Sequence, residues 1–219
     1  MCDTMCDTIS NTMRVIEWQQ FLKSGLSLND KYTSMTVGIF DGVHRGHQAL
    51  IRRIVSHNAD FIPVVVTFRQ NYKTEKREKG KEEREKGEIL SFSQRLESFE
   101  RLGVKITVVV DFTEEFRQMP GRKFLELLLK HGCVGFFAAG SDFRCGFKLD
   151  TDAGMIKSFF TSRNIPVEIV PQVLEGSLPV SSSRIRSAIA AGDFFLAEAM
   201  LGRGEREESH TKARGHEEY

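Results

Sequence analysis

The chain has 219 residues, of which 40% are hydrophobic and 28% are charged, and its formal net charge is +1. This length is sufficient for one sizeable core, so we expect one main domain. The balanced charge argues against a nucleic-acid-binding protein held by bulk electrostatics, and no apolar run approaches the roughly 20 residues of a membrane span. The four cysteines form no CxxC pair, and free thiols of this kind are typical of a cytoplasmic protein.

Short apolar runs alternate with amphipathic stretches through the middle of the chain. Near-continuous apolar strands that alternate with helices predict a parallel sheet covered on both faces. We therefore expect an α/β fold, a Rossmann-like doubly wound parallel sheet in a single domain, with ligands bound beyond the carboxyl ends of the strands. The predicted strands are 36–40, 61–68, 106–110, 133–139 and 167–170, and the predicted helices are 46–57, 91–103, 120–131, 153–163, 182–191 and 194–201.

Three segments differ in composition from this predicted core. Residues 1–12 contain a duplicated tetrapeptide, 73–88 hold seven basic and six acidic residues, and 203–219 hold four basic and five acidic residues. Charged segments of this kind cannot bury enough apolar surface to fold. We predict a disordered N-terminus at 1–12, a domain at 13–202 with a charged insertion at 73–88, and a disordered charged tail at 203–219.

The most informative segment is Gly38-Ile-Phe-Asp-Gly-Val-His44-Arg-Gly-His47, which we call the histidine turn. Its pattern predicts the end of a strand, a tight turn and a helix start, where backbone N–H groups and the helix dipole favour an anion. Gly42 can take a positive φ, and Gly46 allows a phosphate to approach the backbone closely. Two imidazoles at this place suit a phosphate whose charge is being redistributed. A zinc site and simple capping of the helix by the histidines are the alternatives.

A second motif, Pro179-Val-Ser-Ser-Ser-Arg-Ile-Arg186, opens a predicted helix near the end of the domain, and we call it the serine motif. Its hydroxyls can cap the helix or bind phosphate, and Arg186 follows Ser182 by one helical turn on the same face. Arginine is a forked and permanently charged partner for phosphate oxygens. The alternative is an ordinary serine-capped helix with a solvated arginine, and the presence of the histidine turn argues against it.

The two motifs resemble those of the nucleotidylyltransferase superfamily, whose HxGH signature matches His44-Arg-Gly-His47. The longer string FDGVHRGHQ is similar to the adenylyltransferase module of bacterial FAD synthetases, and this resemblance runs from about residue 13 to 203. It implies an FMN adenylyltransferase, which transfers AMP from ATP to FMN and releases FAD and pyrophosphate. It also implies catalytic roles for His44, His47 and Arg186, and ATP binding by Gly38, Phe40, Asp41, Gly42, His44, His47, Ser181, Ser182, Ser183 and Arg186.

The flavin side of the site departs from the family pattern. The family usually shows T-F-x-P-H-P after the second predicted strand, whereas this chain has Thr67-Phe-Arg-Gln-Asn71 and lacks both prolines. By position, the resemblance implies flavin binding by Thr67, Phe68, Arg69, Asn71 and Asp142. Asp142 also stands where the family has a polar residue implicated in holding phosphates or magnesium. We therefore expect Mg²⁺ as cofactor with Asp142 as its ligand; a turn aspartate bonded to its own backbone is the alternative.

In the family, the position of Gly202 leads into a riboflavin kinase barrel. This sequence shows no such barrel, so we expect no kinase activity. The expected partners are the small molecules ATP and FMN, and we expect no nucleic acid, membrane or protein partner. Two other interpretations stay open. One is a nucleotidylyltransferase that acts on pantetheine phosphate, nicotinamide mononucleotide or a cytidylyl acceptor; the other is a flavin- or nucleotide-binding protein without turnover.

Overall fold

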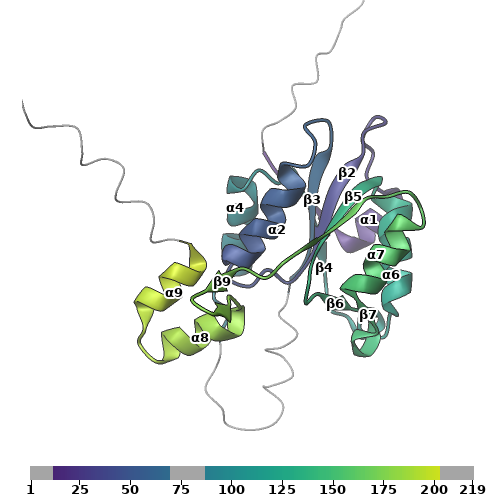
Figure 1. The fold of residues 1–219 in the computed structure, drawn as a ribbon. Coiled ribbons are helices and arrows are strands. Elements are labelled where there is room, and N and C mark those ends of the chain that lie inside the picture. The colour runs from purple at the N-terminus through teal and green to yellow at the C-terminus, as the bar shows by residue number, and fades with distance from the viewer. Residues whose placement is uncertain (1–11, 70–86, 203–219) are drawn as a thin grey trace, which may run out of the picture.

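The computed structural model describes residues 12–69 and 87–202 (Figure 1). The predictions of a disordered N-terminus, of most of the charged insertion and of a disordered tail lie outside these described residues. The described chain forms a central sheet with helices on both sides (Figure 1). This confirms the predicted fold class, an α/β domain with a parallel sheet.

Six strands form the central sheet of the described residues in the order β1-β4-β3-β2-β5-β8. Every neighbouring pair in this sheet is parallel. Two small antiparallel pairs, β6 with β7 and β9 with β10, lie outside it. The bounds are β1 Arg14–Glu17, β2 Thr33–Val37, β3 Ile62–Phe68, β4 Ile106–Val110, β5 Val134–Gly140, β6 Arg144–Cys145, β7 Thr151–Asp152, β8 Val167–Val170, β9 Leu174–Glu175 and β10 Leu178–Pro179.

Helices cover both faces of the sheet (Figure 1). On one face lie α2 (Arg45–Val55) and α4 (Phe92–Arg101), and on the other lie α1 (Trp18–Ser24), α6 (Gly121–His131) and α7 (Ala153–Thr161). In β3, Val64 and Val66 pack into one core and Val65 into the other, and all three are fully buried. A strand buried on both faces is a near-continuous apolar run, which is why β3, β4 and β5 were predictable to within a residue at each end. The edge strand β8 is only half-buried, and its predicted bounds also agree with the structure.

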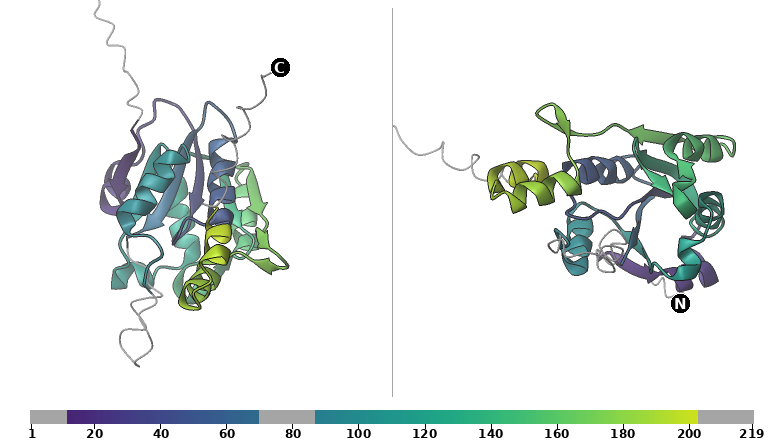
Figure 2. Two further views of the ribbon diagram at one scale, coloured as in Figure 1. Left: turned by 90° about the vertical axis from the view of Figure 1, so that its left-hand side faces the viewer. Right: turned by 90° about the horizontal axis from the view of Figure 1, so that it is seen from below.

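Two further helices, α8 (Ser182–Ala190) and α9 (Phe194–Leu201), form a pair with a small core of their own. This pair lies beside α2 at the edge of the molecule (Figure 2). The amide of Gln48 on α2 donates to the carbonyl of Leu201 at 2.9 Å, so the pair is tied to the main domain by a direct hydrogen bond. Two short segments, α5 (Glu114–Arg117) and the 3₁₀ helix η1 (Phe147–Leu149), complete the described helices.

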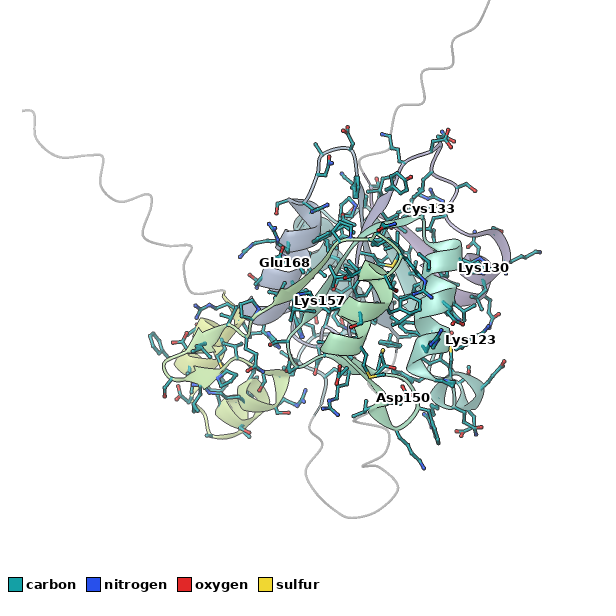
Figure 3. All side chains as sticks on the ribbon, turned by 45° about the vertical axis from the view of Figure 1, so that its right-hand side comes forward. Lys123, Lys130, Cys133, Asp150, Lys157 and Glu168 are labelled. Carbon is teal, nitrogen blue, oxygen red and sulfur yellow. The ribbon has the colours of Figure 1, made fainter. Side chains whose placement is uncertain are left out.

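Local capping determines where several helices begin. Ser91 and Gln94 form a capping box at the start of α4: the hydroxyl of Ser91 accepts the N–H of Gln94, and the amide oxygen of Gln94 accepts the N–H of Ser91 at 2.9 Å. The Ser-Phe-Ser-Gln pattern predicted this start. Helix α6 is capped from a distance, because Asp150, labelled in Figure 3, accepts the N–H of Gly121 at 3.0 Å.

The order of the strands creates a switch point between β2 and β5. From β2 the chain continues to β3 and β4 on one side, whereas β5 and β8 lie on the other side. Loops that follow β2 and β5 therefore diverge at their carboxyl ends, which is where open α/β sheets bind ligands. The histidine turn follows β2 and the turn with Asp142 follows β5.

Several predicted boundaries and elements need correction. The first predicted strand, 36–40, is in fact β2 at Thr33–Val37, and its first residues are the buried polar Thr33 and Ser34, which interrupt the apolar pattern. Strand β1 and helix α1 were not predicted. Only Ile16 is buried in the edge strand β1, so that strand carries no apolar run. Other helix ends differ from the prediction by one or two residues, as frayed ends do.

Candidate active site

The histidine turn has an unusual backbone conformation. Phe40, Gly42 and Val43 have positive φ values of 56°, 83° and 42°, so the prediction for Gly42 is confirmed. The two non-glycine residues are strained positions of a kind that clusters at functional sites. The Phe40 ring folds back over Gly38, where a Cβ would lie 2.9 Å from it. A side chain at Gly38 would therefore displace Phe40.

The start of α2 places two histidine rings face to face. His44 is the N-cap of α2, and its Nδ1 accepts the backbone N–H of His47 at 3.3 Å. The two rings stack with centroids 3.6 Å apart and planes 17° from parallel. Because Nδ1 of His44 is the acceptor, the proton of the neutral ring is assigned to Nε2. Phe40 packs edge to face against His47 at 5.2 Å and supports the second ring.

Burial keeps both imidazoles neutral at pH 7. It lowers the pKa of His44 to about 4, although the carboxylates of Asp41 and Asp142 act in the opposite direction. Burial also lowers the pKa of His47 well below its usual value, and the neighbouring His44 and Arg95 lower it further. Both rings therefore meet a ligand as neutral groups. A bound phosphate would raise both pKa values, because an anion favours the protonated ring.

The two motifs meet at Asp41. Its carboxylate forms an ion pair with the guanidinium of Arg186 and accepts the backbone N–H of Ile89 at 3.0 Å. Its carbonyl oxygen accepts the hydroxyl of Ser182 at 2.9 Å, across 141 residues of sequence. The side chains of Asp41 and Arg186 are 5% and 15% exposed. The structure thus brings together the histidine turn and the serine motif, the two motifs to which the family resemblance assigns ATP binding.

Two helix N-termini converge at this contact. Helix α2 is capped by His44, and α8 is capped by Ser181, whose hydroxyl accepts the N–H of Arg184 at 3.2 Å. The remaining free N–H groups and the positive dipole ends of both helices are therefore close together. A region of this kind suits an anion that carries several charges.

The other predicted ATP residues differ in how they reach the site. Ser183 is exposed in the first turn of α8. Phe40 is 1% exposed, and its ring packs against His47 and Phe99, so its side chain supports the histidine from the protein side. The ATP contacts of these residues stay predictions.

The predicted flavin segment begins in the core. Thr67 and Phe68 end β3 and are buried. The hydroxyl of Thr67 donates to the carbonyl of Ile39 at 3.3 Å, and the ring of Phe68 stacks on Phe112 at 4.5 Å. Flavin contacts of these two residues stay predictions. Asn71 lies outside the described residues.

Arg69 follows β3 and is partly exposed. Its guanidinium pairs with Glu17 at 2.6 Å and with Asp111 at 3.0 Å, which lie at the carboxyl ends of β1 and β4. These two carboxylates raise the pKa of Arg69, with the hydrogen bond to Glu17 as the larger cause. A predicted flavin contact from Arg69 would therefore be made by a side chain that two carboxylates already orient.

Asp142 lies in the turn after β5, across the switch point from the histidine turn. It is exposed, and its charge raises the pKa of His44, so its carboxylate acts on the same region. Among residues 12–69 and 87–202, no group of three or more His, Cys, Asp or Glu residues could hold a metal. Mg²⁺ is commonly held by one or two carboxylates together with substrate phosphates. The single carboxylate of Asp142 fits an ion that is shared with a triphosphate.

Two polar residues of this region were not predicted from the sequence. Gln48 donates to a carbonyl of the histidine turn and to one at the end of α9, both at 2.9 Å. Arg95 of α4 is buried and donates to carbonyls that follow β2 and end β3. The sequence contains one indication that Arg95 is buried: it lies on the apolar face of α4, between Phe92 and Phe99. A charged residue there is buried and needs partners.

A family model for FAD synthetase matches residues 27–184, which contain the histidine turn and most of the serine motif. The chain belongs to the FAD synthetase family. The resemblance of the FDGVHRGHQ string to that family is thereby confirmed.

Curated relatives of this FAD synthetase family member are bifunctional riboflavin kinase/FMN adenylyltransferases. The protein from Escherichia coli (strain K12) is 28% identical over 170 residues, which cover 77% of this chain and 53% of that protein. The protein from Pseudomonas fluorescens is 30% identical over 170 residues, with the same coverage. The chain spans about half the length of the curated relatives it matches.

Solved structures share the fold. A macrolide-efflux protein from Streptococcus pneumoniae matches with a TM-score of 0.73 and 26% identity over 87% of this chain and 60% of that chain. A pantoate-beta-alanine ligase from Francisella tularensis matches with a TM-score of 0.54 and 14% identity over 84% of this chain and 78% of that chain, a likeness of fold alone. Within the described part of the chain, no helix combines the length and apolar character that a membrane crossing requires.

Proposed function

We propose that this member of the FAD synthetase family transfers the adenylyl group of ATP to FMN and releases FAD and pyrophosphate. The observation that carries the proposal is the contact of the histidine turn with the serine motif at Asp41. It gathers two imidazoles, one guanidinium and two helix N-termini in one region. The activity named for the relatives, FMN adenylyltransferase, supports the same conclusion.

In this reaction an oxygen of the FMN phosphate attacks the α-phosphorus of ATP. A new P–O bond forms there, and the bond to the oxygen that bridges the α- and β-phosphates breaks, so that pyrophosphate leaves. The attacking phosphate is already ionised at pH 7, so the reaction requires no strong general base. Catalysis then consists of placing the two substrates in line and stabilising charge as it moves.

His44 and His47 would act on the α-phosphate. The Nε2–H of His44 is available as a donor, because its Nδ1 is engaged by the N–H of His47. The buried Nδ1 of His47 has no hydrogen-bond partner among the described residues. Both rings start neutral, and negative charge that develops beside them raises their pKa values. They would therefore donate most strongly in the transition state.

Arg186, Ser182 and Ser183 would hold the β- and γ-phosphates and the departing pyrophosphate. The ion pair with Asp41 orients the Arg186 guanidinium toward the histidine turn. Asp142 would hold Mg²⁺ together with the triphosphate; when bound, this ion neutralises phosphate charge. These groups would stabilise the leaving group by fixed charge and by hydrogen bonds.

FMN as the acceptor rests on the family and on the segment that follows β3. We propose that the flavin lies against residues 67–71, with Asp142 at its edge. Thr67 and Phe68 are buried, so we expect them to shape the segment, while Arg69 offers a partly exposed guanidinium that Glu17 and Asp111 already hold. The absence of both family prolines makes this segment the part of the site that differs most from the family pattern.

One incubation tests the proposal: purified protein with FMN, ATP and magnesium chloride, with FAD measured by chromatography and pyrophosphate by a coupled assay. Parallel reactions replace FMN with pantetheine phosphate or nicotinamide mononucleotide, replace ATP with CTP, or replace FMN with riboflavin. We expect FAD and pyrophosphate in equal amounts from FMN and ATP, and no FMN from riboflavin.

Other outcomes would point elsewhere. Pyrophosphate release with another acceptor, and none with FMN, would identify another nucleotidylyltransferase. Binding of FMN and ATP without product would identify a binding protein. Formation of FMN from riboflavin would contradict the expectation that this chain lacks kinase activity.

A further inference from the structure

Arg95 lies on the inner side of α4 and is 1% exposed. Its Nη1 donates to the carbonyls of Ile39 at 2.8 Å and Phe68 at 3.0 Å, and its Nη2 donates to the carbonyl of Arg69 at 3.0 Å. The carboxylate of Glu88 lies farther away, 3.9 Å from Nη2. Main-chain carbonyl dipoles are therefore the closest partners of this buried cation.

The three carbonyls belong to two different segments of the proposed site. Ile39 is part of the histidine turn, whereas Phe68 ends β3 and Arg69 follows it, and both belong to the proposed flavin segment. The two segments follow neighbouring parallel strands, with Val37 of β2 opposite Val66 of β3. Because a guanidinium is a planar fork with donors at fixed angles, this one side chain holds both segments in a defined arrangement. The hydroxyl of Thr67, which donates to the same Ile39 carbonyl at 3.3 Å, is a second link between them.

We propose that Arg95 is a positioning residue that sets the spacing between the ATP-binding histidine turn and the flavin-binding segment, so that the two substrates meet in line. This inference rests on the proposed function. With Arg95, the proposed site includes a residue of α4, a helix that contains neither the histidine turn nor the serine motif. The relevant geometry is the pair of hydrogen bonds to Ile39 and Phe68 that a single nitrogen makes.

The charge of Arg95 adds a second effect. Burial lowers its pKa, while Glu88 and Asp41 act in the opposite direction, and a guanidinium remains charged at pH 7. The cation also contributes to the lowered pKa of His47, so its field reaches the proposed α-phosphate position. A buried cation at this place favours phosphate groups on either substrate.

Two variants separate position from charge. R95M removes the charge and all three hydrogen bonds, whereas R95K keeps the charge but replaces the fork with a single ammonium. R163M is the matched control, because Arg163 also donates to a main-chain carbonyl, that of Phe159 at 2.7 Å, and lies over its ring. Arg163 follows α7, which packs on the face of the sheet opposite to α4.

Four quantities are measured for each variant: FMN binding by fluorescence quenching, binding of magnesium α,β-methylene-ATP by calorimetry, kcat for FAD synthesis, and hydrogen exchange of the backbone amides. In R95M we expect both dissociation constants to rise about tenfold and kcat to fall about 100-fold. Exchange should become faster in 38–47 and 62–69 and stay unchanged in 153–161. R95K should recover more of the affinity than of kcat, and R163M should match the wild type.

Wild-type binding and kcat in folded R95M would overturn the proposal. So would a lower melting temperature with unchanged constants, because that result marks a purely structural role. If R95M does not fold, R95K decides: a kcat about tenfold or more below the wild type supports the proposal, and a wild-type kcat overturns it. If the wild type itself makes no FAD, the proposed function fails, and hydrogen exchange in the two segments still tests the position of Arg95.

Discussion

Asp41 and Arg186 form an ion pair that joins the first and the last motif of the proposed site across 145 residues of sequence. Both side chains are largely buried, at 5% and 15% exposure. The hydroxyl of Ser182 binds the carbonyl of the same aspartate. One residue of the histidine turn thus holds both the cation and the first turn of α8, and orients Arg186 before any triphosphate binds.

The first prediction concerns the stability that this ion pair provides. D41N leaves Arg186 charged and without its carboxylate, so we expect the free energy of unfolding to fall by about 3 kcal/mol. E175Q is the control, because Glu175 pairs with Arg45 at a more exposed place, with side chains 30% and 38% exposed. The E175Q substitution should lower the free energy of unfolding by less than about 1 kcal/mol. Urea denaturation measures both variants, and equal losses would contradict the prediction.

The second prediction concerns the stacked histidines. H47A removes one imidazole from the proposed α-phosphate site, and loss of one preorganised group should lower kcat by roughly 100- to 1000-fold. His57 offers a control with the same change, because it stacks on Phe136 after the other end of α2. We expect H57A to keep a near wild-type kcat. FAD formation under saturating substrates measures both, and near wild-type turnover in H47A would remove the histidine from the proposed mechanism.

The third prediction concerns Arg186 in the binding of ATP. R186A removes the guanidinium proposed to hold the leaving pyrophosphate, so kcat should fall by roughly 100- to 1000-fold. The KM for ATP should rise, while the KM for FMN changes little. R53A is the control, since Arg53 pairs with the partly exposed Glu168, labelled on β8 in Figure 3, at 2.5 Å. A rise in the KM for FMN alone would contradict the prediction, because it would show that Arg186 contributes to FMN binding and not to ATP binding.

The fourth prediction concerns stability as a function of pH. The pKa of His44 falls from 6.5 to about 4 on folding, because the ring is buried. Between these values the unfolded chain binds a proton that the folded chain does not, so the free energy of unfolding decreases as the pH falls through this window. The lowered pKa of His47 acts in the same direction.

The H44N variant tests this pH dependence. Asparagine keeps an N-cap acceptor for α2 but does not titrate. The melting temperature of H44N should therefore fall less than that of the wild type between pH 6.5 and about pH 4. Parallel melting curves for the two proteins would contradict the assignment of this pH dependence to His44.

The parts of the fold that the sequence predicted are those with a strong local pattern. Strands β3, β4 and β5 are largely buried on both faces and therefore consist of apolar runs. The edge strand β8 is only half-buried, but three of its four residues are apolar. The edge strand β1 buries only Ile16 and was therefore not predicted. Strand β2 starts with the polar Thr33 and Ser34, so its predicted bounds were shifted toward the C-terminus. Burial in these two strands depends on their neighbours in the sheet, which a local pattern does not contain.

The candidate site divides in the same way. The histidine turn and the serine motif were recognisable because a turn, a cap and a helix start each involve a few consecutive residues. Two contacts could not be recognised in the sequence: the ion pair of Asp41 with Arg186, and the packing of the buried Arg95 against the ends of β2 and β3. These contacts join residues far apart in the chain and therefore exist only in the folded structure.

The amino-acid sequence by itself determined the alternation of strands and helices and the two polar motifs, since periodicity and turn chemistry act over a few residues. Only the tertiary structure decided which motif residues touch, which are buried, and which charged side chain links the histidine turn to the end of β3. The physical reason is that burial, ion pairing and the lowered histidine pKa values arise from packing between distant parts of the chain.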